Sequence, residues 1–97
     1  MVLRRNASRT ILIDELSKGI CKITFKKATN GQFRSILGTL KPSLIPGRYQ
    51  NTIMEVHKAQ DDPNLLPFYD IQEQSWKSFY LNNLLSFYTE DEFKKKK

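Results

Sequence analysis

Three closely spaced runs of apolar and aromatic residues between positions 65 and 88 constrain the fold more than any other feature of the sequence. The first run, residues 65–71, ends at the polar stretch 72–75, and the second, residues 76–81, shows a period of two. That period places successive side chains on opposite faces of a β-sheet. A third run covers residues 84–88. Because two strands alone cannot bury their apolar faces, the N-terminal half of the chain must supply further strands.

The N-terminal half contains a predicted hairpin. Apolar and polar side chains alternate over residues 20–27, which is typical of a half-buried antiparallel strand. The apolar positions are Cys21, Ile23 and Phe25, and the polar positions are Lys22, Thr24 and Lys26. Asn30-Gly31 then predicts a tight turn, because both residue types tolerate positive φ. Residues 33–40 are the predicted returning strand, with a bend or bulge expected at Gly38.

A short helix is predicted before this hairpin. Ile11, Leu12 and Leu16 fall near one helical face, and Ile13 fits that face less well. Gly19 follows the last apolar position and is typical of a helix end. A helix of about two turns is marginal alone, so we expect its apolar side chains to cover one end of a barrel.

The pattern is weakest between the hairpin and the aromatic runs. Pro42 and Pro46 end the second strand, and residues 43–45 between them predict a single 3₁₀ turn. Residues 47–64 mix a few apolar side chains with many polar ones. We expect a long, mobile loop there between two halves of the barrel, with a short strand near residues 52–57. Long loops in compact domains are usually functional or disordered.

Together these elements predict a mainly β fold, a small and strongly bent barrel of about five antiparallel strands with one short N-terminal helix. The 97 residues suit one domain. We expect a flexible basic tail over residues 1–9, a single barrel domain over residues 10–88 with its loop at 47–64, and a charged C-terminal tail over residues 89–97.

The charge and the targeting signals limit the partners. The net charge of +6 comes from the two ends of the chain, since three arginines lie in the first ten residues and four lysines in the last four. A folded body of balanced charge has no automatic attraction for a polyanion, although basic tails add phosphate contacts of their own. We find no long apolar run and no secretory pattern, and the single cysteine suits a reducing compartment. We therefore expect a cytoplasmic protein with no membrane contact.

The second aromatic run also carries a resemblance to a known family. Residues 76–84, Trp-Lys-Ser-Phe-Tyr-Leu-Asn-Asn-Leu, resemble the end of the WYL-like domain, where the pattern is roughly W-R-[ST]-F-R-L-D-R-[IV]. Residues 40–46 match a second pattern, Leu-x-Pro-x-[LYI]-[IL]-Pro, of short stand-alone WYL-like proteins of tailed phages. The resemblance covers about residues 19–88 in separate blocks. It implies an Sm/SH3-like barrel and a phage-type accessory protein in the host cell cytoplasm.

The resemblance points to candidate binding residues on the predicted strands. In the family, basic strand residues hold the ligand in a groove, and Lys77 matches the first Arg of the pattern. The basic candidates are Lys22, Lys26, Arg34 and Lys77. Tyr80, Asn82 and Asn83 depart from the family, because they stand where a second Arg, an Asp and a further Arg are common.

Trp76 and Tyr80 are the aromatic candidates. If Phe79 and Leu81 face inward, these two side chains face outward together, where they could stack on bases for about 1–3 kcal/mol per base. An alternative stays open for both sets of candidates. The cations could lie on ordinary solvated strand faces, and the aromatic rings could pack in the core or against a sheet edge.

The sequence predicts no catalytic, metal-binding or cofactor-binding arrangement. His57 lacks neighbours at the spacing of a metal site, and the four glycines are isolated rather than gathered in a phosphate-binding loop. Cys21 is expected to be a small buried hydrophobic residue. We therefore expect a binding protein rather than an enzyme.

Two functions remain open. The first is binding of nucleic acid, either DNA or RNA, or of a nucleotide-like anionic ligand on the barrel face. The second is a protein-interaction module that binds a host protein without nucleic acid. Sm-like barrels commonly self-associate through edge strands, so a homo-oligomer is open as well.

Overall fold

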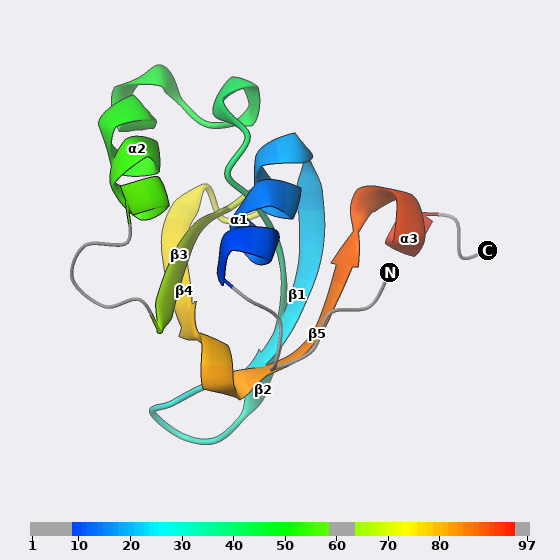
Figure 1. Ribbon diagram of the computed structural model, residues 1–97. Coiled ribbons are helices and arrows are strands. Elements are labelled where there is room, and N and C mark those ends of the chain that lie inside the picture. Colours follow the sequence, from blue (N-terminus) through cyan, green and yellow to red (C-terminus); the bar gives the residue numbers. More distant parts are fainter. Residues whose placement is uncertain (1–8, 59–63, 95–97) are drawn as a thin grey trace.

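A computed structural model describes residues 9–58 and 64–94 of the chain. Five antiparallel strands form one curved sheet in the order β4-β3-β2-β1-β5, and a helix precedes them (Figure 1). The elements are α1 (Arg9–Lys18), β1 (Ile20–Lys26), β2 (Phe33–Thr39), β3 (Leu65–Asp70), β4 (Ser75–Tyr80) and β5 (Leu84–Thr89). The predicted fold class, mainly β with five strands and one short N-terminal helix, is confirmed. None of the described helices is long and apolar enough to cross a membrane.

Strand β5 pairs with β1 and not with β4, which it follows in the sequence. A 3₁₀ turn, η3 (Leu81–Asn83), separates β4 from β5. Lys22 on β1 then faces Tyr88 on β5, and the register shifts by a bulge between Thr24 and Phe25. The last strand therefore lies beside the first one, and the sheet curls around a common core.

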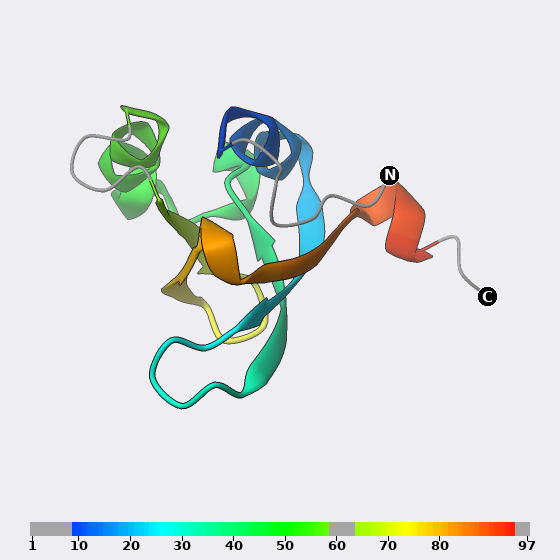
Figure 2. The ribbon, with the colours of Figure 1, turned by 60° about the horizontal axis from the view of Figure 1, so that its bottom comes forward.

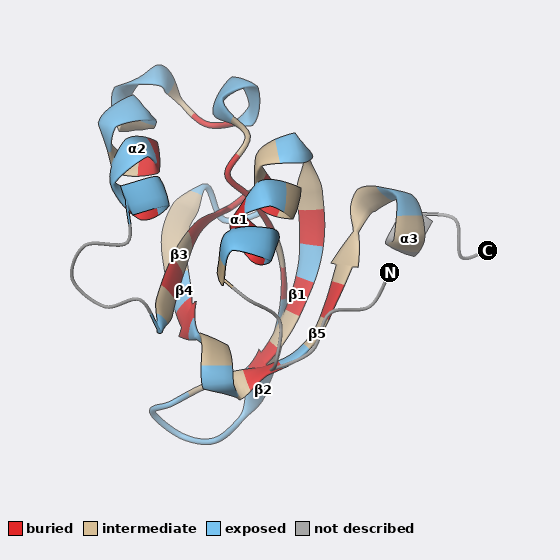
Figure 3. Ribbon diagram, viewed as in Figure 1, coloured by how far each residue is buried: buried red, intermediate tan, exposed pale blue. Residues whose placement is uncertain are grey.

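The core is formed by the inner face of the sheet and by α1, which covers it. Leu12 and Leu16 are fully buried and Ile13 nearly so, whereas Ile11 is 44% exposed. The expectation that Ile11 would face the core is therefore wrong, and Ile13 takes its place. Figure 3 shows buried and more exposed residues alternating along β1, as the period of two predicts. The largest strand side chains that are almost completely buried are Ile23, Leu66, Phe68, Leu84 and Phe87.

Buried Thr39 ties the end of α1 to the sheet. Its hydroxyl lies 3.1 Å from the carbonyl oxygen of Leu16 and 2.7 Å from that of Gly19, and it accepts a hydrogen bond from the backbone N–H of Lys41 at 3.0 Å. The backbone N–H of Leu40 also donates to Leu16 at 2.9 Å. These bonds satisfy carbonyl groups that a helix end would otherwise leave without partners.

A bend or a bulge was predicted at Gly38, and the bulge lies elsewhere. Gly38 pairs in register with Cys21 on one side and with Asp70 on the other, and the bulge lies in β1 instead. A glycine is needed here for space, because a Cβ at this position would lie 2.8 Å from Cε2 of the Phe68 ring. The absence of a side chain at Gly38 lets the buried Phe68 ring pack directly against the backbone of β2.

The long connection between β2 and β3 is more ordered than predicted. It contains two 3₁₀ turns and a helix, which are η1 (Pro42–Leu44), η2 (Gly47–Tyr49) and α2 (Gln50–Lys58). The turn between the prolines is confirmed, but the expectation of a mobile loop with a strand near residues 52–57 is wrong. Buried Ile53 and Val56, three residues apart, form the inner side of α2. Residues 59–63 of the predicted loop lie outside the described residues.

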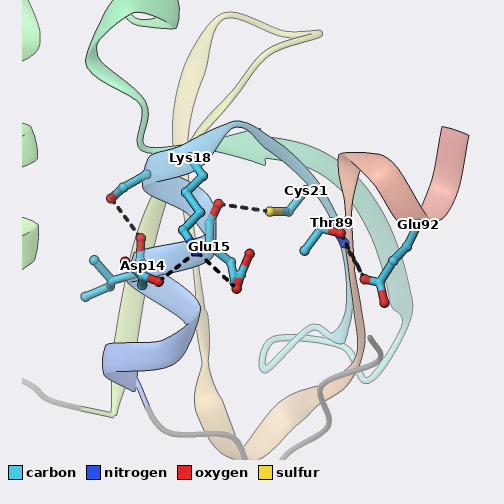
Figure 4. Close-up of polar contacts among 8 residues, drawn as sticks. Asp14, Glu15, Lys18, Cys21, Thr89 and Glu92 are labelled. Atoms are coloured by element: carbon cyan, nitrogen blue, oxygen red, sulfur yellow. Dashed lines mark hydrogen bonds and ion pairs between the residues drawn. The ribbon is translucent and has the colours of Figure 1, made fainter.

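The chain after β5 also departs from the prediction. Thr89 belongs to β5, and α3 (Glu90–Lys94) follows it, so the expected tail is not structureless from residue 89. Glu92 Oε1 accepts hydrogen bonds from the backbone N–H of Thr89 at 2.9 Å and from its hydroxyl at 3.1 Å (Figure 4). The bond from the backbone N–H of Thr89 to Glu92 is one of the two bonds of a capping box. At the other end Arg9 begins α1, and residues 1–8 and 95–97 of the two predicted tails lie outside the described residues.

Candidate functional site

The loop between β1 and β2 presents the first part of the site. The backbone N–H of Lys27 donates to Gln32 at 2.7 Å, and that of Gly31 donates to Lys27 at 3.0 Å. Gly31 has a φ of +73°, and Asn30 Oδ1 accepts from the backbone N–H of Gln32 at 3.1 Å. The hairpin predicted from Asn30-Gly31 is thus confirmed. These bonds fix the loop, and with it the cations that flank it.

A cavity of about 390 Å³ lies between this loop and the end of β4, and we call it the barrel mouth. Figure 1 shows the loop and the η3 turn at the same end of the barrel. Phe25, Ile36, Leu65 and Phe79 supply apolar lining to the mouth. The rings of Phe25 and Phe79 stack with their centroids 5.3 Å apart. The volume falls within the usual range for small-ligand sites.

Positive charge surrounds the mouth. Four cations line it, and no carboxylate occurs among its described lining residues. The cations are Lys26, Lys27, Arg34 and Lys77. The first three form no ion pair or side-chain hydrogen bond with another described residue. A cleft lined by charges of one sign concentrates counter-ions, so this end of the barrel attracts anions.

Lys77 differs from the other three cations because carboxylates already hold it. Its ammonium group lies 2.9 Å from Asp70 Oδ2 and 3.4 Å from Glu73 Oε1. Burial acts to raise the pKa of Asp70, but hydrogen bonds from Lys77 and from the backbone N–H groups of Glu73 and Gln72 outweigh it, and the pKa lies below its ordinary value. The hydrogen bond to Asp70 raises the pKa of Lys77. The main role of Lys77 is therefore to stabilise the β3–β4 hairpin.

The two aromatic candidates lie in different surroundings. Tyr80 lines the mouth and is 42% exposed. Trp76 is half-buried between Tyr49 and Tyr69, with ring centroids 5.8 and 5.6 Å away. The two side chains do not form the exposed pair that the alternation predicted, because the connection to α2 covers Trp76.

Lys22 is also separate from the mouth. It is exposed on the outer face of β1, four residues from Lys26 and thus about 13 Å along the strand. The structure therefore brings four of the six predicted residues together at the mouth: Lys26, Arg34, Lys77 and Tyr80. Sequence reasoning missed Lys27 and Asn83, which also line it. Lys27 has a visible signal, since it lies between Lys26 and the predicted turn.

The opposite end of β1 is acidic. Cys21 is buried there, and its Sγ donates to the backbone oxygen of Glu15 at 3.6 Å (Figure 4). Burial, with the nearby charges of Glu15 and Glu90, raises the pKa of the thiol to about 12. Cys21 is therefore protonated at neutral pH, and its predicted role as a buried hydrophobic residue is confirmed.

The described residues contain no group of three or more His, Cys, Asp or Glu side chains that could hold a metal ion. His57 is exposed, with Nε2 3.5 Å from the hydroxyl of Ser17. This contact joins α2 to α1 on the surface and does not form a set of metal ligands.

Comparison with protein families gives a match over most of the chain. The family model WYL_2, described as an Sm-like SH3 beta-barrel fold, matches residues 9–85. The matched region runs from the first residue of α1 into β5. Comparisons with curated proteins and with solved structures found no significant match.

Proposed function

Because the chain belongs to the WYL_2 family of Sm-like SH3 β-barrels, we propose that it is a small binding module whose barrel mouth takes a nucleotide or another nucleotide-like anion. The charges of the mouth support this proposal. Lys26, Lys27 and Arg34 have no ion-pair partner among the described residues that would compete with a phosphate, and the guanidinium group of Arg34 can bind two phosphate oxygens at once. Tyr80 and the apolar lining offer surface to a base or sugar.

Lys77 takes a secondary part in this proposal. Its ammonium group is shared with Asp70 and Glu73, so a phosphate would have to compete with two carboxylates for it. The same competition makes Arg34, rather than the family-matched Lys77, the main phosphate ligand in the mouth. A phage-type accessory role in a host cytoplasm is part of the proposal and rests on the sequence resemblance alone.

A titration of labelled protein with thymidine 5′-monophosphate, followed by NMR, tests the proposal. We expect the signals of Lys26, Arg34 and Tyr80 to shift together and to saturate. Replacing Arg34 with Gln should weaken binding about tenfold, because a hydrogen bond to a charged group is lost. Lys58→Gln, an equal charge change at the exposed end of α2, is the control and should bind as the parent does. Shifts confined to residues 1–8 and 95–97 would contradict a site in the mouth.

Exposed apolar residues on the helices favour a second candidate, which is binding of a protein partner without nucleic acid. Met54 on α2 is 56% exposed and Ile11 on α1 is 44% exposed. Figure 2 shows both helices at one side of the molecule, with the β1–β2 loop at the other. Added salt distinguishes the two candidates, since phosphate binding weakens with salt in proportion to the number of phosphates contacted and an apolar interface does not.

A further inference from the structure

The outer face of β2, β1 and β5 is a second basic surface next to the mouth. Pairing places its residues in three rows across the strands. Lys22 faces Leu37 and Tyr88, Thr24 faces Ser35 and Ser86, and Lys26 faces Phe33. The alternate residues of β1 point into the core, so these side chains point outward. We call this surface, made by these eight residues, the outer sheet face.

The chemistry of this face suits a polyanion with exposed rings. It carries two lysines, three hydroxyl residues and aromatic Phe33 and Tyr88, and none of the eight residues is acidic. Phe33 is 65% exposed, more than any other large hydrophobic residue of the described chain. A phenyl ring held open on a strand offers a flat apolar surface on which a base can stack.

The outer sheet face begins where the mouth ends. Lys26 belongs to both, because it lines the mouth and faces Phe33 across the two strands. Arg34, next to Phe33 in the chain, also lines the mouth. A ligand with a phosphate beside Lys26 and Arg34 therefore lies next to Phe33, and Lys22 lies about 13 Å further along β1.

We propose that the ligand is a single-stranded nucleic acid that runs from the mouth over the outer sheet face, with one base stacked on Phe33 and a phosphate beside Lys22. This inference rests on the proposed function of the mouth and extends it. A single strand fits better than a duplex, because its base faces are open to an aromatic side chain. The absence of carboxylates among the eight residues supports a phosphate chain as the occupant.

Two ligands and five variants test the inference, and the fifth variant is Arg34→Gln from the test of the mouth. The ligands are a fluorescently labelled decathymidylate, followed by anisotropy, and thymidine 5′-monophosphate, followed by NMR. Phe33→Ala should lower the affinity for the oligonucleotide at least fivefold, the lower bound of about 1 kcal/mol per stacked base. Lys22→Gln should reduce the slope of log K against log salt by about 0.7, the loss of one phosphate contact. Neither change should alter mononucleotide binding by more than about twofold. Met54→Ala and Lys58→Gln, which remove an exposed apolar side chain and a charge from α2, are the matched controls.

The outcomes separate this inference from the function on which it rests. If Arg34→Gln weakens both ligands while Phe33→Ala and Lys22→Gln leave the oligonucleotide unchanged, the outer sheet face is not a binding surface and the mouth still is. If neither ligand binds, the proposed function fails and the inference with it. Equal affinity for duplex and single strand, with no effect of Phe33→Ala, would overturn the stacking. Phe33 is exposed, so circular dichroism should show an unchanged fold in its variant.

Discussion

Replacing Asp70 with Asn tests whether the pair with Lys77 holds the β3–β4 hairpin. Asp70 Oδ1 accepts from the backbone N–H groups of Gln72 at 3.0 Å and Glu73 at 3.1 Å, and Oδ2 accepts from Lys77 at 2.9 Å. Asn has nearly the same shape, and its oxygen can keep the two backbone bonds. Its NH₂ group then faces the ammonium group of Lys77, so two donors meet where an ion pair stood.

The expected loss of stability is about 2 kcal/mol. Removing a hydrogen bond to a charged group costs about 1.5–3 kcal/mol. The carboxylate is only 3% exposed, which favours the upper part of that range, but the Lys77 side chain is 28% exposed and keeps some water. In a domain of this size, a loss of about 2 kcal/mol lowers the melting temperature by roughly 8–16 °C.

The difference between the parent and Asp70→Asn should depend on pH. The pKa of Asp70 is lowered in the fold, so its contribution is present above the unfolded pKa of about 4 and is lost as the pH falls through the folded value. The pKa of Lys77 is raised, so its contribution is lost only as the pH rises above about 10.5. The difference should therefore stay constant between about pH 5 and 10 and shrink below about pH 4.

Urea unfolding, followed by the fluorescence of the single tryptophan and by circular dichroism, measures the effect. Glu73→Gln is the control, because its carboxylate is 66% exposed and lies 3.4 Å from Lys77, and it should cost under about 0.5 kcal/mol. Binding gives a second readout, since Asp70→Asn leaves Lys77 with one exposed carboxylate and should tighten phosphate binding at the mouth. Equal small losses for both variants, or a difference that persists undiminished at pH 3, would refute the assigned role of Asp70.

Two further predictions concern the core. Gly38→Ala places a Cβ 2.8 Å from Cε2 of the fully buried Phe68 ring and should lower the free energy of unfolding in urea by about 1–3 kcal/mol. Adding Phe68→Leu should recover part of this loss. A loss under about 0.5 kcal/mol would contradict the packing. Cys21 has a pKa raised to about 12 by burial and by Glu15 and Glu90, so iodoacetamide should react with it at pH 8 only as fast as the fold opens. The same shift lowers stability as the pH rises from the ordinary value of 9.0 towards about 12, because the unfolded thiol ionises first, and Cys21→Ala should remove that dependence.

Periodicity in the sequence was enough to predict the strands but not what covers them. The alternation over residues 20–27 and the aromatic runs after residue 64 predicted four strands, and Asn30-Gly31 predicted the hairpin. Helix α2 was missed because only Ile53 and Val56 are buried in it, and both are β-branched residues with modest helix propensity. The helix is stabilised instead by contacts with residues far away in the sequence, on the outer side of the β3–β4 hairpin, which the local pattern does not reveal.

The missed helix explains why Trp76 and Tyr80 do not form the expected outward-facing pair. Alternation correctly predicts that Phe79 is buried and that Trp76 lies on the opposite face of β4, but it says nothing of what packs there. Tyr49, at the entrance of α2, covers the indole ring. Predicting the ion pairs of Lys77 required the same kind of information, because Asp70 and Glu73 can be read from the sequence but their distances from the Lys77 ammonium group cannot.

The arrangement of charge in the fold changes what the composition implies. Residues 11–93 carry nine basic and ten acidic side chains, which alone gives no attraction for a polyanion. The register aligns Cys21, Gly38 and Asp70 across three strands at one end of the sheet, and the charges of Glu15 and Glu90 lie close to Cys21 there. Lys26, Lys27 and Arg34 lie at the other end. Although residues 11–93 are nearly neutral overall, three cations without an ion pair among the described residues therefore lie together at the mouth and give that end of the barrel a local positive charge.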